Sequence, residues 1–141
     1  MMDEQDKGLE KKLGMGTDID IAKSVFGDYF PIQKEIMFSF RYAESALNFL
    51  LKADKMLSML KKEGWVCARN AYVVRAEVYS GFVYLRKDNI ELGTAGFVEQ
   101  KGEEIIVQGI LYTPNQSDSE HIYQKIIGNL GRKLCIDLKL E

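Results

Sequence analysis

Apolar residues recur every three or four positions in two early segments of the chain, and this spacing predicts helices. The first segment ends at Gly27, so we expect a short helix over 18–26 that begins near Thr17 with a capping box. The second segment begins at Pro31, a residue favoured at the first helical position, and ends at Gly64. We expect one long helix between these two residues.

The start of the second segment also fits a β-strand. Ile36, Phe38, Phe40 and Tyr42 alternate along the chain, and a period of two is typical of a strand with one buried face. We prefer the single long helix because the residues around Ser45 offer no convincing N-cap for a helix that begins later. The strand remains the alternative, and it would give an elaborated ferredoxin-like sandwich.

From Trp65 to Thr113 the pattern is that of β-strands, with turn residues at Lys87–Asn89 and Lys101–Gly102. We expect an antiparallel meander of four to five strands in this region. A capping box at Ser117 then predicts another helix, which is followed by a terminal strand made of Leu134, Ile136, Leu138 and Leu140.

These elements predict an α+β fold in which the helices cover one face of an antiparallel sheet. Residues 1–16 are polar and lack an apolar period, so we expect a disordered tail there. Residues 17–141 then form a single domain, which is an ordinary length for one hydrophobic core.

Composition narrows the class of protein. The chain of 141 residues is 46% hydrophobic and 28% charged, as in a soluble globular protein. Its net charge of −2 argues against nucleic-acid binding as a main role, because phosphate recognition usually leaves a basic surface. The two cysteines lie inside apolar runs and no signal peptide is visible, which together predict a cytoplasmic protein. The chain also has no uninterrupted apolar span, so we expect no membrane segment.

The predicted long helix carries more apolar surface than one sheet face can cover. Between Ala43 and Leu60 the apolar residues cover more than half of the helix circumference, whereas about a third is enough. A helix of some thirty residues would also overhang the domain, at roughly 45 Å. Coverage by other helices of the same chain is the alternative. We predict a homodimer with this interface: Phe40, Leu47, Leu50, Leu51 and Leu57.

The motif Gly-Phe-Val occurs twice, at Gly81–Val83 and Gly96–Val98, and resembles the RNA-reading strand of RRM domains. An RRM has a basic residue before the glycine, but Ser80 and Ala95 stand there in this chain. We therefore interpret both glycines as turn or strand-opening residues.

We predict no catalytic residue, no metal site and no cofactor. His121 is the only histidine and lies in the first turn of a predicted helix, where its acidic neighbours favour the helix dipole. Neither Cys67 nor Cys135 has a base nearby in the sequence.

The leading functional hypothesis is therefore a non-enzymatic, homodimeric interaction or regulatory module of the inhibitor or adaptor type, with a protein partner. The alternative is a domain that binds a small ligand or nucleotide in a pocket between sheet and helices, into which an arginine points. A weaker alternative is RNA binding on the sheet face. The residues proposed for these binding roles are Arg75, Tyr79, Phe82, Tyr84 and Arg86.

Overall fold

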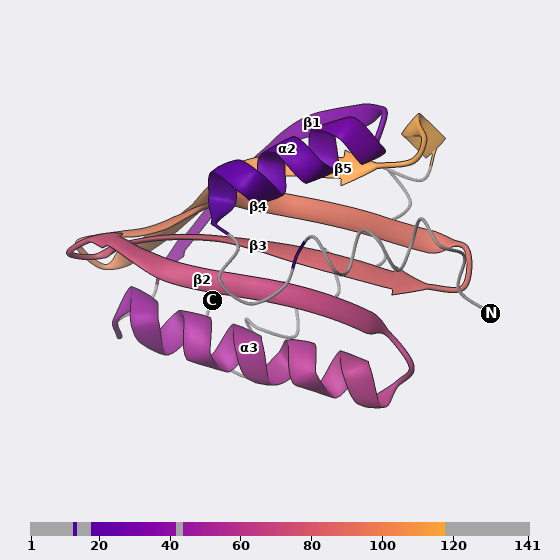
Figure 1. The fold of residues 1–141 in the computed structure, drawn as a ribbon. Coiled ribbons are helices and arrows are strands. Elements are labelled where there is room, and N and C mark those ends of the chain that lie inside the picture. The colour runs from indigo at the N-terminus through magenta and orange to yellow at the C-terminus, as the bar shows by residue number, and fades with distance from the viewer. Residues whose placement is uncertain (1–12, 14–17, 42–43, 118–141) are drawn as a thin grey trace.

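The computed structural model describes residues 13, 18–41 and 44–117, which form two helices and one five-stranded sheet (Figure 1). All strand pairs are antiparallel, and the strand order is β1-β5-β4-β3-β2. The predicted α+β fold is thereby confirmed. In chain order the elements are α2 (Ile19–Tyr29), β1 (Ile32–Arg41), α3 (Ala46–Lys62), β2 (Val66–Arg75), β3 (Val78–Lys87), β4 (Ile90–Lys101) and β5 (Glu104–Thr113).

The single long helix predicted from Pro31 to Gly64 is wrong, and the alternative strand is confirmed. Residues 32–41 form β1, which pairs with β5 along its whole length. That ladder pairs the backbone groups of β1 that face β5, and it outweighs the helical periodicity. α3 begins after Ser45, whose Oγ accepts a hydrogen bond from the backbone N–H of Asn48 at 3.1 Å. Ser45 is therefore the N-cap of α3, and the expectation that no N-cap lies near this residue is wrong.

Other boundaries shift by a few residues. α2 is capped by Asp18 instead of Thr17, and it continues through Gly27 to Tyr29. Within the predicted meander, β2 and β3 are separated by a turn at Glu77, which has a φ of 65°. The predicted turns before β4 and before β5 are confirmed.

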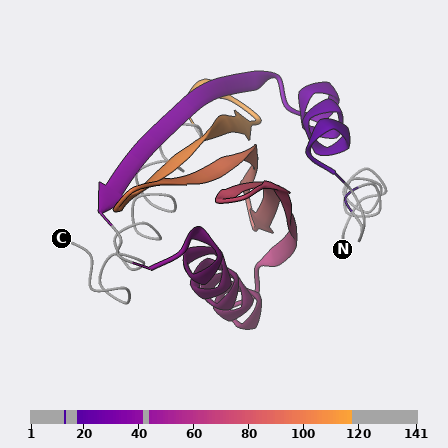
Figure 2. The same ribbon diagram turned by 90° about the vertical axis from the view of Figure 1, so that its left-hand side faces the viewer.

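The two helices lie on opposite faces of the sheet, not on one face as expected. Phe82 and Tyr84 of β3 pack in the cluster beneath α2, whereas Val83 and Leu85 pack in the cluster beneath α3. Because neighbouring side chains of a strand point to opposite faces, the two helices cover different sides. The sheet is strongly curved, with α3 in its concave side and α2 on the other side (Figure 2).

Gln100 holds the start of α3 on the sheet. Its Oε1 accepts a hydrogen bond from the backbone N–H of Ala46 at 3.0 Å, and its Nε2 donates to the carbonyl oxygen of Glu44 at 2.8 Å. At the other side of the sheet, the backbone N–H of Ile19 donates to the hydroxyl of Tyr72 and so ties the start of α2 to β2.

Several predicted features lie outside the described residues. These are most of the predicted tail over 1–16, most of the helix that begins at Ser117, and the terminal strand over 134–140. Leu13 is the one described residue of the predicted tail, and it is buried in the core cluster beneath α2. The predicted domain boundary at residue 17 stays a prediction.

Candidate functional site

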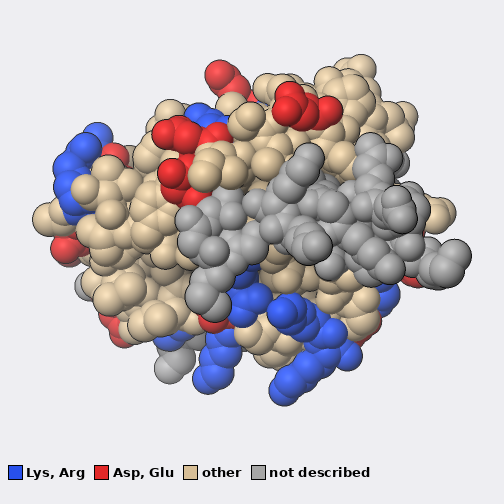
Figure 3. All heavy atoms as spheres, viewed as in Figure 1, with Lys and Arg blue, Asp and Glu red and all other residues tan. Residues whose placement is uncertain are grey.

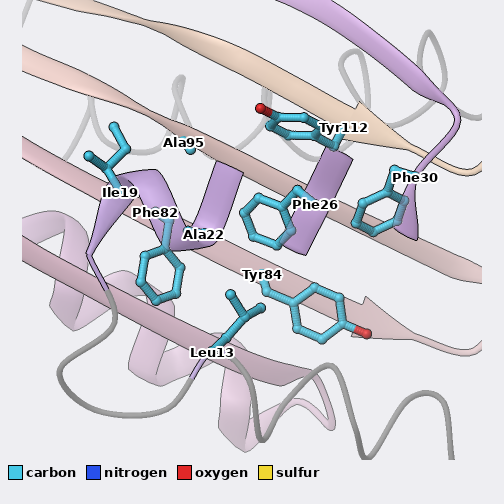
Figure 4. Packing of buried hydrophobic residues seen from close by; sticks show 9 residues of the cluster. All are labelled: Leu13, Ile19, Ala22, Phe26, Phe30, Phe82, Tyr84, Ala95 and Tyr112. Atoms are coloured by element: carbon cyan, nitrogen blue, oxygen red, sulfur yellow. The ribbon is translucent and has the colours of Figure 1, made fainter. Parts of the chain in front are cut away.

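The space between α2 and the sheet is filled by aromatic side chains (Figure 4). The ring of Phe26 lies at the centre, with ring centroids 5.3 Å from Tyr112, 6.0 Å from Phe30 and 6.3 Å from Phe82. Phe26 also occupies the space above Gly93, where an added Cβ would lie 2.7 Å from the ring. The space above Gly93 on this face of the sheet is therefore filled by the side chain of Phe26.

A polar cluster lies at the edge of this aromatic core. The hydroxyls of Tyr29 and Tyr84 both donate hydrogen bonds to the carboxylate of Glu91. Tyr84 is completely buried, and this burial, together with the hydrogen bond to Glu91, raises the pKa of its hydroxyl. Burial also raises the pKa of Tyr112. The raised pKa keeps the Tyr84 hydroxyl protonated, so that it acts as a hydrogen-bond donor to Glu91.

Three glycines form a row across the middle of the sheet. Gly81 pairs with Gly96, and Gly96 pairs with Gly109 on the next strand. A Cβ at these positions would lie 2.1–2.5 Å from a backbone carbonyl oxygen of a neighbouring strand. The row therefore lets the backbones approach more closely than any side chain would permit, which is consistent with the strong curvature of the sheet.

The core beneath α3 is divided at this row. One cluster contains Ala46, Phe49 and Ile105, and the other contains Leu57 and Leu111 among its buried residues. Between the clusters lies a cavity of about 170 Å³. Its walls are formed by Leu50 of α3, the glycine row and the half-buried side chains that flank the row: Ile36, Tyr79, Val83, Thr94, Val98 and Val107.

A second hollow, of about 420 Å³, lies between α3 and the edge strand β2. Leu47 and Leu51 on α3 are 49% and 62% exposed, and Val73 on β2 is 64% exposed. These three residues line the hollow, which we name the α3–β2 groove. Within the groove, Arg69 donates hydrogen bonds to Asp54 and to Ser58 Oγ. The contact with Asp54 raises the pKa of the Arg69 guanidinium.

The two helices differ in charge. α3 carries four lysines and one aspartate, a net charge of +3, whereas α2 with its cap carries three aspartates and one lysine, a net charge of −2. Figure 3 shows basic side chains gathered along the lower edge of the molecule, where α3 runs, and acidic side chains on the upper part, where α2 runs. The exposed leucines of the α3–β2 groove therefore lie on the basic side of the molecule.

The structure does not bring the five predicted ligand-binding residues together. Phe82 and Tyr84 are buried beneath α2, so they are not available for base stacking in this conformation. Tyr79 lies on the opposite face, in the first cluster beneath α3. Arg75 is exposed at the end of β2, and Arg86 lies opposite Glu91 on the α2 face. Neither arginine lines either hollow beneath α3.

The predicted dimer residues fall into three groups. Leu47 and Leu51 are exposed, Leu50 is half-buried over the cavity, and Leu57 is buried against the sheet. The side chain of Phe40 lies outside the described residues. Because α3 has 17 residues, about 25 Å in length, the predicted overhang of the long helix is absent.

The described part of the chain contains no group of three or more histidine, cysteine or carboxylate side chains placed to hold a metal ion. His121 and Cys135 lie outside it, and Cys67 is half-buried beside Arg69. No helix within the described ranges is long and apolar enough to cross a membrane.

Comparison with known protein families, curated proteins and solved structures gives no match to this chain. The glycine row is the feature that sequence reasoning missed. Gly81 and Gly96 were interpreted as turn or strand-opening residues, yet both lie within strands and pair with each other. The sequence did contain a signal for the glycine row, because three successive strands of the meander each have an internal glycine. The pairing of the strands then places these glycines opposite one another.

Proposed function

We propose that this protein is a non-enzymatic interaction module that binds an acidic, amphipathic segment of a partner protein in the α3–β2 groove. The observation that carries the proposal is the exposure of Leu47 and Leu51 beside this groove, with lysines on the same helix. The exposure of apolar side chains to water is unfavourable, and their burial under an apolar partner surface lowers the free energy of the complex.

The spacing of these residues fits a helical or extended partner segment. Leu47, Leu51 and Lys55 lie four residues apart, so they form one stripe along α3. Val73 faces this stripe from the other wall of the groove. A partner segment would place apolar side chains between Leu51 and Val73 and carboxylates near Lys55, and hydrophobic burial would supply most of the affinity.

Charge favours a different protein over a second copy as the occupant. A two-fold dimer through α3 would bring two helices of net charge +3 together, and like charges at close range oppose association. Nucleic acid would also meet the basic side, but phosphate contacts make no use of exposed leucines. An acidic segment with apolar residues uses both features of the surface.

Fluorescence anisotropy with a labelled synthetic peptide tests the proposal. The probe is a helical peptide of about 15 residues with leucines on one face and glutamates on the other, long enough to form a helix. We expect Leu51→Glu to weaken binding at least tenfold, since roughly 1.5–3 kcal/mol of leucine burial is lost. Lys55→Glu should weaken it less, and mainly at low salt.

Met37→Glu is the matched control, because Met37 is 71% exposed on β1 and lies outside the groove. The proposal is wrong if Leu51→Glu binds the peptide as wild type does, or if a peptide with lysines in place of the glutamates binds equally well. Light scattering on the protein without peptide tests the predicted homodimer. If the wild type is a dimer and the Leu51→Glu variant is a monomer, the groove binds a second copy of this chain instead of a different protein.

A further inference from the structure

We infer that the cavity above the glycine row is a binding site for a small, uncharged, apolar molecule about the size of one aromatic ring. This inference is independent of the proposed function, because it rests on the cavity beneath Leu50 and not on the exposed residues of the α3–β2 groove. It also differs from the predicted pocket, in which an arginine was expected.

The chemistry of the walls defines the class of ligand. The described residues that line the cavity include no charged side chain. Strand alternation places Val83, Val98 and Val107 on the α3 face, where they are half-buried and line the cavity. Thr94 and Tyr79 are on the same face and add hydroxyl groups. An apolar ring with at most one hydrogen-bonding group matches this lining.

The volume fits such a ligand. The cavity measures about 170 Å³, and an apolar cavity of roughly 150 Å³ in another protein stays dry and binds benzene. The cavity and the α3–β2 groove share Leu50, Ala71 and Val83 among their lining residues, so they are neighbours beneath α3. A ligand can therefore enter from the groove side without unfolding the sheet.

The cavity is built into the backbone and is not an accident of one side chain. A Cβ at Gly96 would lie 2.1 Å from the carbonyl oxygen of Gln108, so the row cannot be filled from the sheet side. On the opposite face the gap above Gly93 is occupied by Phe26, which shows how the same chain closes such a space elsewhere. On the α3 face, by contrast, the three atoms nearest to an added Cβ at Gly96 or Gly109 are backbone atoms of the neighbouring strand, with no aromatic ring among them.

Titration with benzene, followed by amide proton–nitrogen correlation NMR spectra, tests the inference. We expect saturable shifts at residues around the glycine row, and a higher melting temperature at saturation. Sodium benzoate has the same ring and a charge, and it should produce no such shifts because the cavity offers no cation.

Val107→Phe should weaken benzene binding at least about tenfold, since the new ring occupies the cavity. Val107 does not line the groove, so peptide binding should be unchanged. Val74→Phe is the control, because Val74 is exposed on β2 and lines neither hollow. If Val107→Phe does not fold, Val107→Ile replaces it and should give a smaller loss. Non-saturable benzene shifts, equal binding of benzoate, or a Val107 variant that binds as wild type would each overturn the inference.

Discussion

The two faces of the sheet bury their helices in different ways. Beneath α2, three aromatic rings pack around Phe26, whose own ring fills the space above Gly93. Beneath α3, two separate apolar clusters leave a cavity at the glycine row. The described residues therefore pack an aromatic core over Gly93 on one side of the sheet and leave a cavity at the glycine row on the other side. We infer that the first stabilises the fold and that binding belongs to the second.

Truncation of one large side chain on each face is the strongest test of this difference. Phe26→Ala should lower the free energy of unfolding by about 3–5 kcal/mol, because it leaves a large void in a packed aromatic core. Leu50→Ala should cost only about 1–2 kcal/mol, since Leu50 is half-buried and already borders a cavity. Urea denaturation of both variants measures the two values. Equal losses would mean that the two faces contribute alike to stability.

Gly93→Ala tests whether Phe26 closes the α2 face by filling the space above a glycine. The new methyl would lie 2.7 Å from the Phe26 ring, and we expect a loss of about 1–3 kcal/mol from overpacking. Phe26→Leu in the same chain should recover part of that loss, which a double-mutant cycle measures.

Gly27→Ala is the matched control for this substitution. Gly27 lies within α2, and an added Cβ would lie 3.7 Å from Gln33, an ordinary contact. Here the same change should raise stability by about 0.5–1 kcal/mol. A stabilising effect at Gly93 as well would contradict the close packing of Phe26 against the sheet.

Alkaline pH should weaken the α2 face specifically. Burial and the hydrogen bond to Glu91 raise the pKa of Tyr84 in the folded protein, whereas the unfolded chain has the ordinary pKa of about 10. The unfolded state therefore loses this proton first, so the stabilisation is complete below about pH 10 and declines above it, by about 1.4 kcal/mol per pH unit.

Tyr84→Phe removes this ionisation and should make the decline above pH 10 less steep, although Tyr112 still contributes because its pKa is also raised. Urea denaturation at several pH values measures both slopes. Parallel slopes for the variant and the wild type would show that Tyr84 does not carry the effect.

The smallest effect is expected at the contact between α3 and β2. Asp54→Ala removes the partner of Arg69 within the groove. Because the Asp54 side chain is mostly exposed, we expect a loss of at most about 1 kcal/mol, which high salt should reduce. A loss of several kcal/mol would mean that this ion pair, and not the two apolar clusters, holds α3 on the sheet.

Much of the architecture could be predicted from the sequence, because local patterns carried it. The alternation along β5 and the turn residues before β4 and β5 depend on neighbouring positions alone. The choice between helix and strand at residues 32–41 could not be made locally. The apolar periodicity of these residues fits both a helix and a strand, and only their pairing with β5 decides for the strand.

The candidate site was less predictable. Exposure of Leu47 and Leu51 agrees with the surplus apolar surface seen in the sequence, but Leu57 on the same helix is buried. The five proposed ligand-binding residues were grouped by their proximity along the strands, and alternation then separated Tyr79 from Phe82 and Tyr84. Contacts between segments that lie far apart in the sequence decide which face of each strand packs against α2 and which packs against α3.

The sequence by itself determined the element types of the meander and the apolar character of α3. Only the tertiary structure decided that Gly81, Gly96 and Gly109 share one row, because strand register is a relation between segments. It also decided that Phe26 fills the space above Gly93 on one face while the described residues leave a cavity at the glycine row on the other, since packing depends on which side chains meet across the sheet.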